Sequence, residues 1–298
     1  MIHKHLLDIA DNFDTFFFDA WGVFNFGGPV SQSAIAVMAE LMARGKSVSI
    51  MSNTPQTVDG MMAHYAKNGL VSGVHFQNAF SSGQLCYERI NSGALPVSGK
   101  SYYIAWDNTG SPLLNAQYNL FRDSDYVQVS DINDADFVYC DFPTHSGALF
   151  SDEGLMAPEL EKLAMMGLPI ICANADLHAM SGGVALITQG LPCKILEQRG
   201  VPVIYYGKPY PEIYTDAMTK LVNPDPSRTV MIGDTLHTDI LGATRAGIRS
   251  CLTLVGGISA NDLTAQGLDL TRANLDAAAV AIGARIDYVI EKVPANEL

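Results

Sequence analysis

Short apolar runs typical of buried strands alternate with amphipathic segments along the whole chain. Residues 15–18 and 48–51 are two such runs, and residues 33–44 between them carry apolar side chains at helical spacing before Gly45. This alternation is typical of an α/β fold with a largely parallel sheet. With 298 residues, 48% of them hydrophobic, the chain can bury a large core and form two domains. The predicted fold class is therefore α/β, with a Rossmann-like parallel sheet at its centre.

The predicted strands fall into two groups. A first sheet would take residues 15–18, 48–51, 203–206, 229–232 and 249–254. A second sheet would take residues 102–105, 137–140 and 169–172, with a helix at 158–166. Because the second group lies between members of the first, we expect an α/β domain of residues 80–204 inserted into a core of residues 1–79 and 205–298.

The segment after residues 48–51 predicts how the next helix begins. Thr54 can cap that helix, and Pro55 can stand in its first turn, where a missing backbone N–H costs nothing. The helix would then run to Lys67, before Gly69.

The composition excludes several classes of protein. A formal charge of −13, without any cluster of Lys and Arg, argues against nucleic-acid and anionic membrane surfaces. No apolar run approaches a membrane span, and residues 1–14 lack the apolar stretch of a signal peptide. Five widely spaced cysteines, mostly in apolar runs, are typical of buried free thiols in a reducing compartment. We expect a cytoplasmic protein that binds neither nucleic acid nor membrane.

The apolar run at residues 15–18 leads directly into an acidic residue. Asp19 follows three phenylalanines and precedes Trp21 and Gly22. A carboxylate at the carboxyl end of a central strand points into the crevice where open α/β sheets bind their ligands, and a glycine lets the backbone fold closely around that ligand. Asp19 is therefore the first candidate for chemistry.

Further polar groups follow other predicted strands of the first sheet. Ser52 and Asn53 follow one strand, Lys208 another, and Asp234 a third, with Asp239 five residues further on. An open α/β sheet brings such strand ends into one crevice, where carboxylates repel unless a hard cation, most simply Mg²⁺, is held by their oxygens. Lys208 and Ser52 could hold a substrate anion against that metal. Phosphoryl transfer needs this combination of a carboxylate, a metal ion, a lysine and a small hydrogen-bond donor.

The segments around these residues resemble, in order, the four motifs of the haloacid dehalogenase (HAD) superfamily: FFFDAWGV, IMSN, GKPYPEIY and MIGDTLHTDI. The last two forms, and the long insertion before them, resemble the class IIA branch, which includes NagD-like nucleotidases, phosphoglycolate phosphatases and p-nitrophenyl phosphatases. The segment CANAD, residues 172–176, resembles that branch's N-P-D loop, with Ala175 where proline is usual. The resemblance covers most of the chain.

This resemblance implies a role for each matching residue. Asp19 would be the nucleophile that forms an aspartyl-phosphate, and Lys208 would act with it. The phosphate and substrate would be held by Ser52, Asn53, Lys208, Asn174 and Asp176. The Mg²⁺ ligands would be Asp19, Asp234 and the backbone carbonyl of Trp21, with Asp239 in support. The inserted domain would be a cap that selects the leaving group, and it could also form a homodimer.

Trp21 departs from the family's pattern. Phosphatases of this superfamily have Asp at that position, which protonates the departing alkoxide and then activates water. An indole N–H does not give up its proton at neutral pH. Since general acid–base assistance is worth roughly 10²–10⁴ in rate, we expect the metal and phosphate sites to survive with weakened hydrolysis of alkyl phosphates.

Plainer interpretations are open for several of these residues. Trp21 is most simply a packing residue, Lys208 could be a solvated loop charge, and Ser52 could cap a helix. Asn174, Asp176, His178 and His145 lie in segments that are commonly just turns. His237 could substitute as an acid or base, although a histidine at a helix entry is more often a surface residue.

Two hypotheses of different classes follow. The leading one is a Mg²⁺-dependent HAD hydrolase that acts on phosphate esters of small metabolites, such as a sugar phosphate or a nucleotide. The second is a phosphate-binding or regulatory protein that kept the pocket and lost turnover. Hydrolysis of C–P or C–halogen bonds is a third alternative, but the sequence offers no obvious cap lysine for the imine that phosphonate-cleaving members use.

Overall fold

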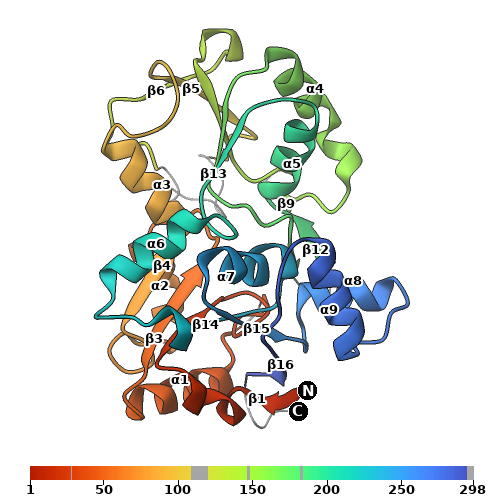
Figure 1. Cartoon of the computed structure of the whole chain (residues 1–298). Coiled ribbons are helices and arrows are strands. Elements are labelled where there is room, and N and C mark those ends of the chain that lie inside the picture. The colour runs from red at the N-terminus through yellow and green to blue at the C-terminus, as the bar shows by residue number, and fades with distance from the viewer. Residues whose placement is uncertain (28, 109–119, 146–147, 182–183, 294–298) are drawn as a thin grey trace.

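The computed structural model describes residues 1–27, 29–108, 120–145, 148–181 and 184–293. Figure 1 shows two α/β domains, one above the other in this view, with the N-terminus and the last strand, β16 (Tyr288–Lys292), in the lower one. The chain leaves the lower domain after β4 (Asn78–Ser81) and returns to it after β13 (Val203–Tyr205). The predicted α/β fold with a parallel core sheet is confirmed.

The lower domain, the core, is built on a seven-stranded sheet that is parallel throughout. Its order is β1 (His3–His5), β16 (Tyr288–Lys292), β15 (Arg249–Thr253), β14 (Thr229–Gly233), β2 (Thr15–Phe18), β3 (Ser47–Ser52) and β4. Phe18 pairs with Ile232 on one side and Ile50 on the other, so the carboxyl ends of these three strands lie level. β2 is fully buried because both faces of the sheet are covered, which explains its unbroken apolar sequence.

The upper domain, the cap, is built on a five-stranded parallel sheet. Its order is β13, β10 (Ile170–Cys172), β7 (Phe137–Cys140), β5 (Ser101–Ala105) and β6 (Val127–Val129). Two antiparallel hairpins accompany it: β8 (Thr144–His145) with β9 (Ala148–Leu149), and β11 (His178–Ser181) with β12 (Val184–Ile187).

The assignment of residues 203–206 to the first sheet is wrong. Val203 pairs with Ile170, and Tyr205 pairs with Cys172, so β13 is an edge strand of the cap sheet. The side chains of Val203 and Tyr205 pack against the apolar cluster of the cap. A short apolar run has the same appearance in either sheet, and only tertiary packing decides between them.

Helices cover both sheets (Figure 1). The α-helices are α1 (Gln32–Ala43), α2 (Val58–Ala66), α3 (Ser82–Asn91), α4 (Ala157–Met166), α5 (Gly190–Gln198), α6 (Pro211–Lys220), α7 (Leu241–Ala246), α8 (Ile258–Ala265) and α9 (Arg272–Ala281). Single 3₁₀ turns lie at Leu6–Asp8, Ala10–Asn12, Ile132–Asp134, Glu153–Met156 and Pro226–Arg228. In the described part of the chain, no helix is both long enough and apolar enough to cross a membrane. All five cysteines are buried free thiols, as their apolar surroundings predict.

The predicted start of the second helix is also wrong. Thr57, not Thr54, caps α2, and its hydroxyl accepts a hydrogen bond from the N–H of Gly60 at 3.5 Å. Thr54 lies in the preceding loop, where its carbonyl accepts hydrogen bonds from the N–H of Gly83 and the hydroxyl of Ser82, both at 3.0 Å. These long-range bonds hold the loop against the start of α3, so the helix begins later than the local sequence predicts.

The predicted domain boundaries fall inside strands. The boundary at residues 79/80 divides β4 of the core sheet, and the boundary at 204/205 divides β13 of the cap sheet. Buried side chains of both sheets, among them Phe17 and Met231 of the core and Tyr102 and Tyr139 of the cap, share one apolar cluster. The division into two independent domains and a homodimer through the cap stay predictions.

Candidate active site

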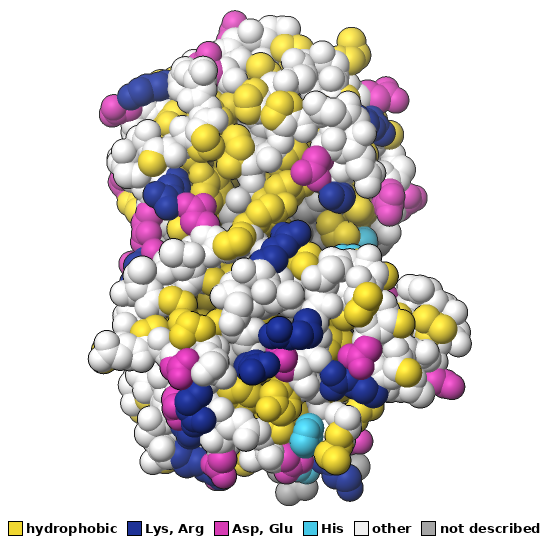
Figure 2. All heavy atoms as spheres, viewed as in Figure 1, with side chains coloured by type: hydrophobic (Ala, Val, Ile, Leu, Met, Phe, Trp, Pro, Cys, Tyr) yellow, Lys and Arg dark blue, Asp and Glu magenta, His cyan; other side chains and the backbone are white. Residues whose placement is uncertain are grey.

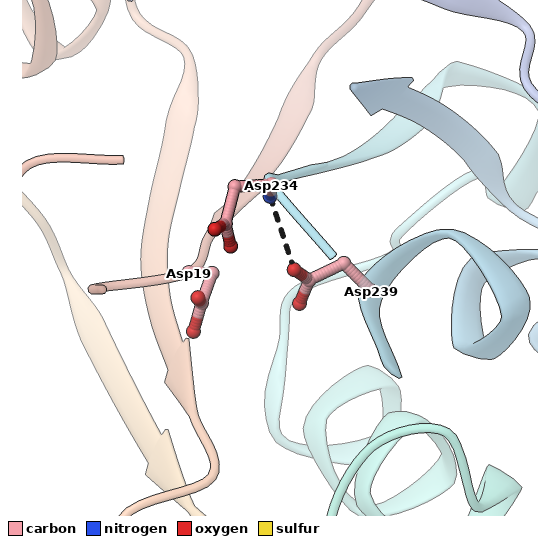
Figure 3. A group of neighbouring side chains, drawn as sticks. All are labelled: Asp19, Asp234 and Asp239. Carbon is pink, nitrogen blue, oxygen red and sulfur yellow. Dashed lines mark hydrogen bonds between the residues drawn. The ribbon is translucent and has the colours of Figure 1, made fainter. Parts of the chain in front are cut away.

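Three carboxylates gather where neighbouring strands of the core sheet end (Figure 3). Asp19 follows β2, Asp234 follows β14, and Asp239 lies in a π-helical turn, Leu236–Ile240. The N–H of Asp19 donates to the carbonyl of Ile232 at 2.9 Å, which continues the pairing of the two strands. All three side chains are buried, and one oxygen of each lies within 4.8 Å of the others. The structure therefore brings these three predicted residues together.

Lys208 supplies the cation of this cluster. It lies between β13 and α6, is 1% exposed, and donates hydrogen bonds from Nζ to Asp19 Oδ1 at 2.6 Å and to Asp239 Oδ1 at 2.7 Å. Burial by itself would lower the pKa of Lys208, but the carboxylates of Asp19 and Asp239 outweigh burial and raise this pKa well above its usual value. Lys208 is therefore a buried, charged member of the site, and its interpretation as a solvated loop charge is wrong.

Asp239 holds the cluster in place. Its Oδ2 accepts hydrogen bonds from the backbone N–H groups of Asp234 and Thr235, both at 3.1 Å, and the first of these is drawn in Figure 3. Its Oδ1 is engaged by Lys208. An ideal Cβ on Gly233 would lie 2.1 Å from Asp239 Cγ, so this carboxylate can approach the end of β14 only because residue 233 is glycine. With both oxygens bonded within the protein, Asp239 suits a supporting position.

Three carboxylates share one ammonium group in this cluster, and the pKa values of Asp19 and Asp234 reflect both their burial and the neighbouring negative charge. Burial raises the pKa of Asp19 well above its usual range, with Lys208 opposing the shift and Asp239 and Asp234 adding to it. Burial, together with Asp239, raises the pKa of Asp234 to about 7. A hard divalent cation that prefers oxygen ligands, such as Mg²⁺, would offset the excess negative charge. The donor set therefore fits this metal.

Asp234 is held by the two segments that follow it. Its Oδ2 accepts a hydrogen bond from the N–H of Ile258, the first residue of α8, at 2.7 Å, and its Oδ1 accepts one from the Thr235 hydroxyl at 3.1 Å. Gly22 approaches Asp234 from the other side. An ideal Cβ on Gly22 would lie 2.2 Å from Asp234 Oδ2, and Gly22 has a φ of +74°. The glycine after Trp21 is thus required by backbone conformation and by space.

We expect Gly22→Ala to lower the free energy of unfolding by about 3 kcal/mol, because the new methyl group displaces Asp234 in addition to straining the backbone. Gly45→Ala is the matched control, since Gly45 has the same φ of +74° with nothing within 4 Å of an added Cβ. This control should lose only the conformational term, about 1 kcal/mol. Urea denaturation of both variants measures the difference, and equal losses would contradict the close approach.

Asn53 joins the core to the cap beside this cluster. Its Nδ2 donates to Asp176 Oδ1 at 3.0 Å and to the carbonyl of Lys208 at 2.8 Å, and its Oδ1 accepts from the N–H of Lys208 at 2.7 Å. The N–H of Asp176 donates to Asn174 Oδ1 at 3.0 Å. Burial raises the pKa of Asp176, with Lys208 opposing the shift. The cap segment 172–176 therefore reaches the same site as the motifs of the core.

A cavity of about 230 Å³ lies above Asp19 between the two domains. Its lining includes seven of the predicted residues: Asp19, Trp21, Ser52, Asn53, Asn174, Asp176 and Asp234. Ser52 is buried and does not cap α2, which Thr57 caps. Trp21 is half-buried, and it packs partly against the apolar cluster of the core and partly lines the cavity.

The structure separates the histidines that the sequence analysis considered. His178, at the start of β11, lines the cavity that contains Asp19 and Trp21. His237 is exposed and lines a neighbouring cavity that contains neither of these residues. The side chain of His145 lies outside the described part of the structure. Of the two described histidines, His178 is therefore the one placed beside the predicted nucleophile.

Several residues of the site could not be identified from the sequence. The cap contributes apolar side chains to the cavity wall: Phe142, Leu149, Ala179 and Leu186. These belong to short hairpins and loops whose position over the core depends on tertiary packing. Thr235 and Ile258 contribute hydrogen bonds to the carboxylates, mainly through their backbone N–H groups, which every sequence position offers. The residue type therefore could not have indicated Ile258, and for Thr235 only the hydroxyl bond to Asp234 depends on it.

Comparisons with known proteins find similar sequences in one family. A family model described as HAD-hydrolase-like matches residues 205–286. Mouse chronophin is 27% identical over 281 residues, which cover 89% of this chain and 90% of chronophin. Chicken glycerol-3-phosphate phosphatase is 25% identical over 265 residues, which cover 83% of this chain and 81% of that enzyme. The Escherichia coli ribonucleotide monophosphatase NagD is 35% identical over 98 residues, 33% of this chain and 38% of NagD.

Solved structures agree on the fold. A haloacid dehalogenase-like hydrolase from Brucella suis matches with a TM-score of 0.77 at 23% identity, covering 98% of this chain and all of that one. A glycerol phosphate phosphatase from Mycobacterium tuberculosis, solved in complex with magnesium, matches with a TM-score of 0.64 at 20% identity, covering 98% of this chain and 77% of that one. The chain is thus similar to proteins of the HAD superfamily and, within it, to the NagD-like and chronophin-like proteins of the class IIA branch.

Proposed function

We propose that this protein is a Mg²⁺-dependent hydrolase that releases phosphate from small phosphorylated metabolites through an aspartyl-phosphate on Asp19. The observation that carries the proposal is the bonding of Lys208 Nζ to both Asp19 and Asp239, within a buried cluster of carboxylates that fits a divalent cation. The similarity to glycerol-3-phosphate phosphatase and to NagD supports a small phosphate ester as the substrate class.

In this mechanism a carboxylate oxygen of Asp19 attacks phosphorus, and the bond from phosphorus to the leaving-group oxygen breaks. Lys208 and the Ser52 hydroxyl would stabilise the phosphoryl oxygens as charge develops on them. Asp19, Asp234 and the backbone carbonyl of Trp21 would hold a Mg²⁺ ion, which would supply positive charge to offset the negative charge of the site. Water then hydrolyses the aspartyl-phosphate, which regenerates Asp19 and releases inorganic phosphate.

A phosphatase panel tests this proposal. It should span aryl, acyl and sugar phosphates and nucleotides, each assayed with Mg²⁺ and again with EDTA. We expect phosphate release that EDTA abolishes and added Mg²⁺ restores. Turnover that persists in EDTA would contradict the metal-dependent mechanism.

Trp21 favours a second candidate, a binding or regulatory protein of the same fold. Its indole lines the cavity where this superfamily's phosphatases carry a general acid, and an indole cannot donate a proton to an alkoxide. Tight Mg²⁺-dependent binding of phosphate, without turnover of any ester in the panel, would support this candidate over the hydrolase.

We expect Trp21→Asp to raise turnover of an alkyl phosphate, such as glycerol 3-phosphate, by about 10²-fold, with little change for p-nitrophenyl phosphate. An alkoxide needs a proton as it departs, whereas an aryloxide is already stable as an anion. Trp21→Phe is the control, because it removes the indole without adding an acid. Steady-state rates on both substrates decide the outcome. Equal gains on both, or efficient alkyl turnover by the native protein, would mean that another residue supplies the proton, with His178 the first to test.

A further inference from the structure

A second and larger cavity, about 480 Å³, lies beside the one that contains Asp19. The two cavities share four lining residues, Asp176, His178, Thr235 and Ile258, so they adjoin. The volume falls within the range typical of small-molecule sites. A leaving group on a phosphoryl group at Asp19 could therefore extend past these shared residues into the second cavity.

Basic side chains from both domains line this second cavity. Lys194 comes from α5 of the cap, and Arg245 comes from α7 of the core. Figure 2 shows Lys and Arg side chains at the junction of the two domains and just below it. The chain as a whole carries a net charge of −13, yet two cationic side chains line this one cavity.

These two cations differ in how well the protein already neutralises them. Lys194 Nζ forms an ion pair with Glu197 at 2.9 Å, on the exposed face of the same helix. Arg245 forms no ion pair with any carboxylate among the described residues. Asp262 is an exposed carboxylate in the wall, and half-buried Asp176 lines both cavities. Arg245 is therefore the cation most available to a ligand.

Aromatic rings complete this wall. The rings of Tyr205 and Tyr210 stack with centroids 5.0 Å apart and planes 9° apart, and both residues line the cavity. Tyr205 belongs to β13 of the cap, and Tyr210 precedes α6 of the core. The stacked pair therefore joins the two domains in the wall that also contains Lys194 and Arg245.

We propose that this second cavity binds an anionic group at the far end of the substrate's leaving group, a carboxylate or a second phosphate, between Arg245 and Lys194. The proposal rests on the hydrolase function proposed above and names its substrate class: phosphate esters that carry a second anion. Arg245 can form two parallel hydrogen bonds with such a group, and Lys194 adds a point charge from the cap. Because the two residues belong to different domains, the bound anion also holds the cap against the core.

Matched pairs of compounds test this inference. Phenyl phosphate and 4-carboxyphenyl phosphate differ by one carboxylate, as do glycerol 3-phosphate and 3-phosphoglycerate. Ribose 5-phosphate and ribose 1,5-bisphosphate differ by a second phosphate, and this pair separates phosphate from carboxylate recognition. Each compound is assayed as a competitive inhibitor of p-nitrophenyl phosphate hydrolysis. We expect the second anion to lower the inhibition constant by about tenfold or more in at least one pair.

Three variants test which residues cause the preference for the second anion. Arg245→Gln should reduce the preference for the second anion to less than about threefold, and Lys194→Gln should reduce it by a smaller factor. Arg199→Gln is the matched control: it removes one positive charge at the end of the same helix as Lys194, from an exposed residue that does not line the cavity. This control should keep the native preference.

The outcomes distinguish this inference from the hydrolase proposal itself. If p-nitrophenyl phosphate is hydrolysed and no pair shows a preference, or if Arg199→Gln loses the preference as fully as Arg245→Gln, the second-anion site is wrong and the hydrolase stands. If the native protein hydrolyses nothing, the hydrolase is wrong, and calorimetric titration of the same pairs with Mg²⁺ replaces inhibition as the readout. Tighter binding of the dianionic member, lost in Arg245→Gln, would then still support the site.

Discussion

Asp19→Asn is expected to lower Mg²⁺-dependent phosphate release by roughly 10⁴-fold or more, because it removes the attacking carboxylate and one ligand of the metal together. Asparagine has nearly the same shape as aspartate, and Lys208 keeps its second partner, Asp239, at 2.7 Å. The fold should therefore survive. Initial rates with p-nitrophenyl phosphate measure the loss, and circular dichroism verifies folding.

A matched substitution elsewhere controls for loss of charge. The side chain of Asp11 is 94% exposed. Asp11 lies in a 3₁₀ turn before β2, whereas Asp19 follows the other end of that strand. Asp11→Asn should keep the parental rate within a factor of about two. If Asp19→Asn also kept the parental rate, the aspartyl-phosphate mechanism would be wrong.

Lys208→Met is expected to produce the largest loss of stability in this chain. The ammonium of Lys208 is 1% exposed and is bonded to two buried carboxylates, which methionine would leave without a compensating charge. Removing one partner of a buried ion pair typically costs about 3–5 kcal/mol. We expect a decrease of that size in the free energy of unfolding, measured by urea denaturation in EDTA.

A surface variant and added Mg²⁺ test whether the loss of stability comes from the buried carboxylates. Lys220→Met is the control, because the side chain of Lys220 is 45% exposed and its ion pair with Asp216 lies on the surface, where such pairs contribute about 0–1 kcal/mol. Saturating Mg²⁺ should restore part of the stability of Lys208→Met, since a bound cation would offset the carboxylates. A loss below about 1 kcal/mol in EDTA would contradict the electrostatic account of Lys208.

Local sequence predicted the central strands of the core well. The run of three phenylalanines before Asp19 indicated a buried strand, and β2 spans those residues with both faces covered. Asp234 and Ser52 were predicted at the ends of neighbouring strands, where the structure has them. Polar residues at the ends of apolar runs could be recognised because a parallel sheet buries its strands on both faces and leaves ligand groups only at their carboxyl ends.

Long-range contacts decided the rest. β13 joined the cap sheet instead of the core sheet, and α2 began at Val58 because Thr54 is held by hydrogen bonds to Ser82 and Gly83. The apolar wall above Trp21 and the meeting of Lys194 with Arg245 at one cavity likewise depend on how the cap sits on the core. The sequence by itself determined the α/β class, the carboxylates and the lysine, because each is marked by its own residue type and its neighbours in the chain. Tertiary structure alone decided which surfaces face one another, because those contacts join residues far apart in sequence and leave no local pattern.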